Sequence, residues 1–395
     1  VDGTSETRIG EVVASIDGTV VGSIPATGAY QIGIPGDSTG ENVMNAIAAM
    51  KTVVDVDTAD PIFPITPAEL VPNDPLWPLQ VGVAAIRAPE TWTIATGAVA
   101  IAVVDTGVDA THPDLAGKVV VLPGSDVLDG DDDPSDPDGH GTRMAGIAAA
   151  IGNNLYAVAG VSWSSPVIAV RAFGAGGSDV SLASGIVFAA ANGARVISVS
   201  GTLREASPVI VDAVEFARER GCLIVASAGN TNGGPAVETY PCALEGVLCV
   251  GAVDGADRPL EGTNSGPWVD LAAPGEDVPT ITPGADVAIV SGTSPAAAMV
   301  AGAAAVLWST EPSLTAAEVG DRLQAGAAAL DGHNSTLGAG RVDLFESTFD
   351  GSFELPGLGT WETDGTVSVL TSLGPIVPTD RDRMDDIGFP DHEYL

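Results

Sequence analysis

The chain has 395 residues, 45% of them hydrophobic and 17% charged, so it can bury a large core, and its length allows two or three domains. Its 52 acidic residues against 15 basic ones leave a formal net charge of -37, which repels nucleic acid and anionic membranes and favours cations. No uncharged apolar run reaches about 18 residues, so no membrane span is expected, and no basic-then-apolar leader follows Val1, so we expect any export signal to be removed or to lie outside this sequence.

The first 60 residues predict a small α+β unit. Apolar residues at helical spacing predict a helix at 9–16, strand-like runs follow at 19–24 and 30–34, and a capping box at 38–41 opens a second helix at 41–50. Residues 52–56 read as a closing strand. The stretch 60–72 has four prolines in 13 residues and is predicted to be a linker without regular structure.

Between about 73 and 345, apolar strand-like runs alternate with helical ones. The predicted strands are 99–104, 167–170, 196–199, 223–226 and 247–250, and the predicted helices are 140–151, 181–191, 208–220 and 294–308. This alternation predicts an α/β domain, in which helices cover both faces of a parallel sheet and the buried strands are short apolar runs. Active sites gather at the carboxyl ends of such strands, and Asp105 directly follows the run 100–104.

After about residue 346 the sequence becomes rich in Gly, Thr and Ser and contains an alternating run at 366–370. This texture predicts either the start of a β-rich domain or a disordered tail. The expected organisation is therefore 1–60, a linker at 61–73, the α/β domain at 74–345 and the segment 346–395.

Three cysteines are too few for a disulfide scaffold. Cys242 and Cys249 lie seven residues apart around a predicted turn, so they form either a local disulfide or two small buried side chains. Cys222 lies in an apolar run and is expected to be an unreactive core thiol.

Three residues occupy local signatures that indicate nucleophilic catalysis: Asp105 in Val-Asp-Thr-Gly, His140 in Gly-His-Gly-Thr, and Ser294 in Ser-Gly-Thr-Ser. A serine hydroxyl becomes a useful nucleophile only when an imidazole takes its proton and a carboxylate orients that imidazole. Ser294 precedes Pro295 and an apolar run, so it is expected at a helix N-terminus, where free amides face an oxyanion. Taken singly, these residues read as a turn residue, a structural or metal-binding histidine and a helix cap. Jointly, in the order Asp, His, Ser, they predict a serine hydrolase.

These signatures, together with the stretch 105–115, Ala-Gly-Asn at 228–230 and Asp-Leu-Ala-Ala-Pro-Gly at 270–275, resemble the subtilisin-like serine proteases, or subtilases, over about residues 74–345. The resemblance implies a three-layer subtilisin-like fold with a central, mostly parallel sheet between helices. It implies that Asn230, otherwise an ordinary turn residue, donates to the oxyanion, a contact worth about 3 to 4 kcal/mol. It also implies a substrate-binding strand and turn at Ser200, Gly201, Ser227 and Gly229.

Four positions depart from the family pattern. Arg143 replaces the second histidine of His-Gly-Thr-His, outside the triad. Pro295 has no N–H, which would damage the oxyanion hole of an α/β-hydrolase, whereas subtilases use the nucleophile's own amide, so this proline is expected to be tolerated. Gly201 and Thr202 differ from the family's Ser-Leu-Gly strand, which leaves subsite specificity open.

Calcium is the expected cofactor. Seven carboxylates within the thirteen residues 126–138 repel one another unless a hard cation or solvent relieves them. Thermitase-like subtilases bind calcium in this loop, and the resemblance assigns Asp126, Asp129, Asp131 and Asp133 as ligands. A second site is suggested at Asp74, Asp114 and Asn154. The alternative is a solvated acidic loop without an ion.

The resemblance implies an exported, calcium-stabilised, monomeric serine endopeptidase that acts on protein or peptide substrates. Residues 1–60 resemble the inhibitory propeptides of this family, although the expected first strand is missing, and they would bind the protease domain as an intramolecular inhibitor. Two rivals remain: a non-catalytic binding protein that kept the fold, and an esterase-type acyl hydrolase that shares the triad.

Overall fold

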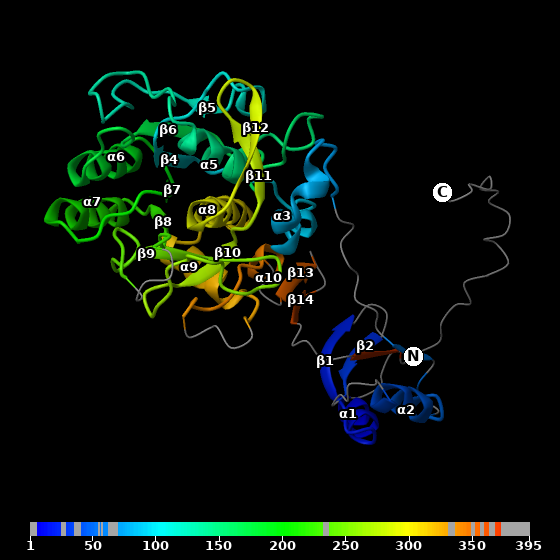
Figure 1. Ribbon diagram of the computed structural model, residues 1–395. Helices are drawn as coiled ribbons and strands as arrows, with labels where there is room; N and C mark the ends of the chain where they lie inside the picture. Colours follow the sequence, from blue (N-terminus) through cyan, green and yellow to red (C-terminus); the bar gives the residue numbers. More distant parts are fainter. Residues whose placement is uncertain are drawn as a thin grey trace, which may run out of the picture. The chain divides into compact units, whose positions relative to one another are not determined.

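The computed structural model describes residues 6–24, 29–34, 41–53, 56, 58–61, 70–231, 237–330, 336–348, 352–355, 359–362 and 368–372 (Figure 1). The chain forms two compact units, one of Val1–Thr66 with Asp350–Leu395 and one of Pro67–Phe349. The predicted capping residues 38–40, the linker residues 62–69 and the tail from 373 onward lie outside the described residues.

The larger unit is built on a seven-stranded parallel sheet with the strand order β10-β9-β8-β7-β4-β6-β5. The strands are β4 (Ile101–Asp105), β5 (Val119–Val120), β6 (Val167–Arg171), β7 (Val196–Val199), β8 (Leu223–Ser227), β9 (Val247–Val253) and β10 (Leu271–Pro274). The predicted α/β fold with a central parallel sheet between helices is confirmed.

Helices cover both faces of this sheet because side chains along a strand point alternately to either side (Figure 1). In β4, Ile101 and Val103 join the core formed with α5 (His140–Ala149) and α8 (Thr293–Thr310). Ala102 and Val104, between them, join the core formed with α6 (Asp179–Ala191) and α7 (Pro208–Glu219). Both faces of β4 are therefore buried, which explains its continuous apolar sequence.

Several short elements of this unit escaped prediction. They are the two edge strands β5 and β10 of the parallel sheet, η1 (Trp77–Leu79), α3 (Val81–Ala85), α4 (Ala88–Thr91), η2 (Pro113–Leu115), the antiparallel hairpin of β11 (Val278–Thr282) and β12 (Asp286–Val290), α9 (Ala316–Ala325) and α10 (Leu344–Thr348). Of these, α9 carried a readable signal, because Thr315 and Glu318 form a capping box at its start.

The smaller unit contains α1 (Glu6–Ala14), β1 (Thr19–Ile24), β2 (Ala29–Gly33), α2 (Glu41–Met50) and β3 (Thr58–Pro61). The prediction of a strand at 52–56 is wrong, because the backbone turns after α2: Val53 N donates to Met50 O, and Val56 N donates to Val53 O. The strand comes later and takes in Asp60 and Pro61, which were expected to be linker. Proline is tolerated there because β3 is an edge strand.

A strand from the C-terminal segment completes the sheet of this unit. The sheet order is β1-β2-β15-β3, and β15 (Ser368–Ser372) pairs antiparallel with both β2 and β3. The hairpin of β13 (Ser352–Leu355) and β14 (Gly359–Glu362) precedes it. The described residues after 350 are strands, as the β-rich alternative predicts.

The cysteines are also placed. Cys242 and Cys249 form a disulfide, the first of the two alternatives. Cys222 is 2% exposed, its Sγ donates to Ala194 O, and burial raises the pKa of its thiol, in agreement with an unreactive core position. Within the described residues, no helix is both long and apolar enough to cross a membrane.

Candidate active site

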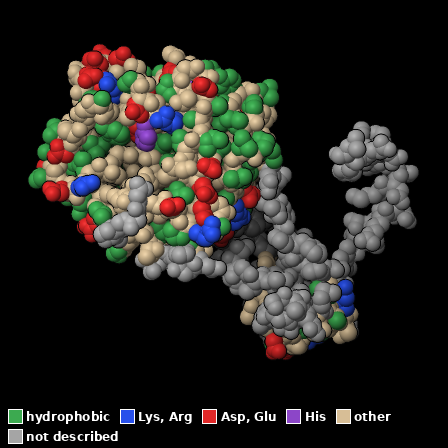
Figure 2. Space-filling model, viewed as in Figure 1, with side chains coloured by type: hydrophobic (Ala, Val, Ile, Leu, Met, Phe, Trp, Pro, Cys, Tyr) green, Lys and Arg blue, Asp and Glu red, His purple; other side chains and the backbone are tan. Residues whose placement is uncertain are grey.

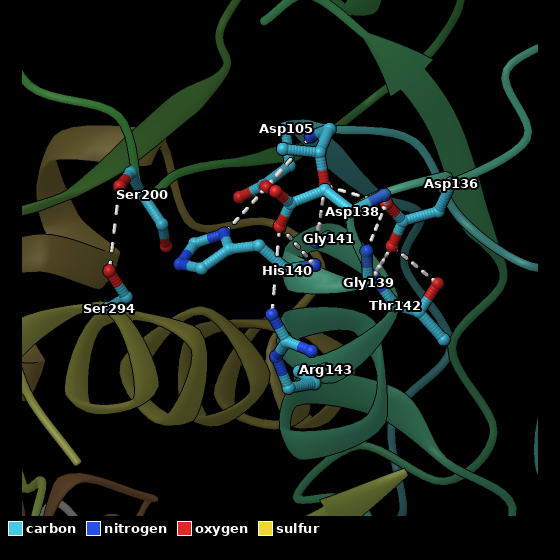
Figure 3. Close-up of polar contacts among 11 residues, drawn as sticks. Asp105, Asp136, Asp138, Gly139, His140, Gly141, Thr142, Arg143, Ser200 and Ser294 are labelled. Atoms are coloured by element: carbon cyan, nitrogen blue, oxygen red, sulfur yellow. Dashed lines mark hydrogen bonds and ion pairs between the residues drawn. The ribbon is translucent and has the colours of Figure 1, made fainter. Parts of the chain in front are cut away.

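Asp105, His140 and Ser294 come from three different elements of the larger unit. Asp105 is the last residue of β4, His140 is the first residue of α5, and Ser294 is the second residue of α8. His140 Nδ1 lies 2.7 Å from Asp105 Oδ1, and the side chains are 28% and 1% exposed. The imidazole lies between the Asp105 carboxylate and the pair Ser200 and Ser294, which come from the end of β7 and the start of α8 (Figure 3). The structure therefore brings together the three residues predicted to be catalytic.

The pKa of His140 is raised above its ordinary value by opposing effects. Burial lowers this pKa, while the charge of Asp105 and its hydrogen bond raise it. The charge of Arg143, one turn along α5, lowers it, and Asp138 raises it. The net effect stabilises the imidazolium, which is the form that a base takes after accepting a proton.

Ser294 lies in the first turn of α8. Its Oγ donates to Ser200 O at 3.5 Å, and within the described residues no hydrogen bond joins it to His140. Gly292, the residue that caps α8, has a φ of 137°, a backbone conformation that a residue with a Cβ adopts only with strain. Pro295 falls among the first helical residues, whose amides have no partner within the helix, so its missing N–H costs no helical hydrogen bond, as predicted.

Asn230 lies against the start of α8. Its Oδ1 accepts from Thr293 N at 3.0 Å, so the Nδ2 amide is the group of this side chain that can donate. The turn before it is held by Thr293 Oγ1, which accepts from Gly229 N at 3.0 Å, and by Asn264, whose Nδ2 donates to Ala228 O at 2.8 Å. The predicted oxyanion donor thus contacts the residue before Ser294, and Asn264 is a supporting residue that no motif indicated.

The residues expected to bind substrate lie at neighbouring strand ends. Ser200 and Gly201 directly follow β7, and Ser227 ends β8, two residues before Gly229. A Cβ at Gly201 would lie 2.8 Å from the Phe173 ring, so this ring occupies the space that a larger side chain would need. The departure at Gly201 therefore has a packing reason.

The second candidate cation site is compact and buried. Asp74 and Asp114 are 3% and 0% exposed, and Asn154 Nδ2 donates to Asp114 Oδ1 at 2.7 Å. Burial raises the pKa of Asp114 to about 6, with the charge of Asp74 contributing, and burial also raises the pKa of Asp74. All four carboxylate oxygens accept N–H groups, from Asn153, Asn154 and Val158, so these groups already offset part of the repulsion between the two acids.

The carboxylates of the acidic loop are also engaged, two of them by a cationic side chain. Asp126 and Asp129 each lie 2.5 Å from Arg171 Nη1, so these two carboxylates already share a cation. Asp131 Oδ1 and Asp133 Oδ1 accept backbone amides from Asp133 and Ser135. Among the described residues, no cluster of three or more acidic, histidine or cysteine side chains is arranged to hold a metal.

Comparisons with known proteins agree with this geometry. The profile of the subtilase family, peptidase S8, matches residues 96–340. The chain is 40% identical over 273 residues to a thermophilic serine proteinase of Bacillus sp. strain AK1, covering 68% of this chain and 67% of that protein. It is 39% identical over 282 residues to thermitase of Thermoactinomyces vulgaris, covering 70% and 98%.

A solved protease structure from Pseudoalteromonas arctica PAMC 21717 matches with a TM-score of 0.64 and 30% identity, covering 70% of this chain and 98% of that one. Fold and site thus define an α/β protein of the serine peptidase class. The chain belongs to the subtilase family of serine peptidases.

Proposed function

We propose that this protein is an exported serine endopeptidase whose catalytic triad is Asp105, His140 and Ser294. The observation that carries the proposal is the 2.7 Å contact of Asp105 with His140 in a site that also holds Ser294 at a helix N-terminus. Membership of the subtilase family supports hydrolysis of peptide bonds.

The mechanism follows from these positions. His140 removes the proton from Ser294 Oγ as that oxygen attacks the scissile carbonyl, and Asp105 orients the imidazole and stabilises the imidazolium. Asn230 Nδ2 and the Ser294 amide bind the oxyanion. The imidazolium then protonates the leaving amine, and a water repeats the cycle on the acyl-enzyme. Apo sites often have long contacts that tighten with substrate, which accommodates the separation of Ser294 from His140.

Labelling with a fluorophosphonate tests the triad. We expect a single adduct on Ser294 in active protein and no adduct in Ser294→Ala. The matched control is Ser291→Ala, which should be labelled normally. Ser291 lies on the loop before α8, and its hydroxyl accepts from Asp277 N. Absence of the adduct in the unsubstituted protein would favour the inactive binding-protein alternative.

Hydrolysis of unfolded casein, compared with a simple ester, tests the reaction type. We expect Ser294-dependent cleavage of casein at internal peptide bonds. Turnover of esters with intact casein would instead identify an acyl hydrolase.

We also propose structural calcium, held by Asp74, Asp114 and Asn154, with the 126–133 loop as the weaker second candidate. A chelator should lower the melting temperature, and Asp114→Asn should abolish this sensitivity while Asp321→Asn on α9 preserves it. The ions compete with protons for Asp114, so the chelator effect should shrink as the pH falls below about 6. A melting curve that does not respond to chelator contradicts this site.

We propose finally that residues 1–60 are an inhibitory propeptide released by cleavage in 61–73, and that 346–395 are an accessory segment. The division of the chain supports the first point, because residues 1–60 belong to the unit of Val1–Thr66 with Asp350–Leu395 and not to the unit of Pro67–Phe349 that carries the proposed triad. Mass spectrometry of the active chain should find a new N-terminus within 61–73, whereas Ser294→Ala should stay uncut. An active enzyme that keeps residues 1–60 attached would contradict this maturation.

A further inference from the structure

Asp136 lies next to the segments that carry Asp105 and His140, and the proposed mechanism gives it no role. It precedes His140 by four residues and is 7% exposed. Both of its carboxylate oxygens are used. Oδ1 accepts from Thr106 Oγ1 at 2.8 Å, Gly139 N at 2.7 Å and Asp138 N at 3.2 Å, and Oδ2 accepts from Thr142 N at 2.8 Å and Thr142 Oγ1 at 2.7 Å (Figure 3).

These hydrogen bonds satisfy backbone amides at the start of α5 that its own cap residue cannot satisfy. The residue at the cap position is Gly139, which has no side chain to accept the free amides of the first turn. Three side chains from elsewhere accept them: Asp138 Oδ1 takes His140 N at 3.2 Å, Thr106 Oγ1 takes Gly141 N at 2.9 Å, and Asp136 Oδ2 takes Thr142 N. The carboxylate also places a negative charge at the positive end of the helix.

The same bonds connect the two catalytic segments. Thr106 follows Asp105 directly, and its hydroxyl donates to Asp136 while it accepts from Gly141 N, the amide that follows His140. The approach is close, because a Cβ at Gly141 would lie 2.1 Å from Gly107 O and 3.0 Å from Asp105 Cβ. The backbones that carry the carboxylate and the imidazole are therefore held together through Asp136 and Thr106.

Asp105 itself is held by few contacts. Its Oδ1 accepts from His140 Nδ1 and from Thr106 N at 2.8 Å, while Oδ2 is buried without a hydrogen-bond partner in the described part of the chain. The distance between carboxylate and imidazole thus depends on the frame around them. We propose that Asp136, acting through Thr106 and the first turn of α5, is the positioning residue that sets the Asp105–His140 geometry.

The inference rests on the proposed triad. It also requires that residue 136 carry a carboxylate, because an amide cannot accept all five of these hydrogen bonds. In the variant Asp136→Asn, the side-chain amide would retain one accepting oxygen, while its NH2 group would face either the three donors on one side or the two on the other. Displacements of about 1 Å cost on the order of 100-fold in rate. We therefore expect Asp136→Asn to lower kcat by about 10- to 100-fold per titrated active site, with KM changed by less than about 3-fold.

Two conservative substitutions of Thr106 test the role of its hydroxyl. Thr106→Val keeps the shape and removes the hydroxyl, so it should reproduce the loss, and Thr106→Ser should restore most of the activity. The double variant Asp136→Asn with Thr106→Val should lose much less than the product of the single losses, because both act through one connection. Asp179→Asn is the control, since Asp179 is a half-buried acid at the N-terminus of another helix, α6.

Two readouts distinguish positioning from a role in stability alone. A loosened contact weakens the influence of Asp105, so the acid limb of the pH profile should move to lower pH, and the low-field proton resonance of His140 Nδ1 in full-length Ser294→Ala protein should shift or broaden in the Asp136→Asn background. An unchanged acid limb and resonance, with full kcat per titrated site, overturn the inference even if the melting temperature falls. An unsubstituted protein without a Ser294 adduct overturns the proposed triad instead, and the resonance, which needs no activity, still reports on Asp136.

Discussion

Individual charged side chains shift the pKa of His140, the proposed general base. His140 is half-buried and contacts Asp105, and Arg143 and Asp138 add charges of opposite sign around it. Arg143 occupies the position where the family often has histidine, and its guanidinium lies 3.3 Å from Thr282 Oγ1 and 3.6 Å from Asp138 Oδ1. The substitution that looked neutral in the sequence therefore places a permanent positive charge beside the imidazole.

We predict that the acid limb of kcat/KM lies above about pH 6.5, the ordinary pKa of histidine, because the imidazolium must lose its proton before His140 can act as a base. Arg143→Gln should move this limb to still higher pH, since it removes a charge that lowers the His140 pKa. The profile is measured with a neutral peptide, and Arg220→Gln, at the residue that follows α7, is the control. A limb that moves to lower pH in Arg143→Gln contradicts this interpretation.

At the scale of elements, α5 and α8 carry two catalytic candidates and pack closely against each other. Gly302 of α8 is the point of closest approach, because a Cβ there would lie 2.7 Å from Ala148 O and 2.7 Å from Val161 Cβ. Helix propensity alone favours alanine over glycine by about 1 kcal/mol. Packing therefore overrides propensity at this crossing.

Gly302→Ala should accordingly destabilise the protein by about 1 to 3 kcal/mol, as overpacked cores do. Gly320→Ala on α9 is the matched control, because a Cβ there would meet only Leu223 and Leu248 atoms at 3.9 and 4.0 Å. That change should be neutral or stabilising. Denaturant unfolding in the Ser294→Ala background, which prevents autolysis, measures both, and equal effects would contradict the packing argument.

The other end of α5 is held by Lys118, whose Nζ donates to Ala149 O and Trp163 O. Burial lowers the pKa of Lys118 to about 7, opposed by the charge of Asp114. The unfolded lysine, with a pKa near 10.4, binds more protons than the folded one between these values, so this residue makes stability rise with pH across that window. Lys118→Met should flatten the rise, as measured by unfolding at pH 6 to 10, and an unchanged slope would contradict the lowered pKa of Lys118.

At the scale of the whole molecule, the excess of carboxylates is the dominant electrostatic property. The chain carries 52 acidic and 15 basic residues, and Figure 2 shows acidic side chains in several groups over one face. Like charges at this density repel one another and weaken the compact state. Arg171 between Asp126 and Asp129 relieves only part of this repulsion.

Raising NaCl from about 10 to 500 mM shortens the Debye length several-fold, so we predict that the melting temperature of calcium-loaded Ser294→Ala protein rises over this range. Sucrose at matched osmolality is the uncharged control. A melting temperature that falls with salt would show that specific ion pairs outweigh the general repulsion.

The sequence by itself determined the alternating α/β architecture and the identity of the catalytic candidates, because buried parallel strands require continuous apolar runs and the triad signatures are local. The sequence also predicted where α8 starts, because Pro295 is compatible with the first turn of a helix. The strand β3, which replaces the one expected at 52–56, pairs with the distant strand β15, and the local hairpin of β11 and β12 packs against α5, where Thr280 Oγ1 donates to Arg143 O. Only the tertiary structure placed Asp136 between Thr106 and α5 and Arg171 between two loop carboxylates, since hydrogen bonds and ion pairs across 30 to 45 residues leave no periodic trace in a chain.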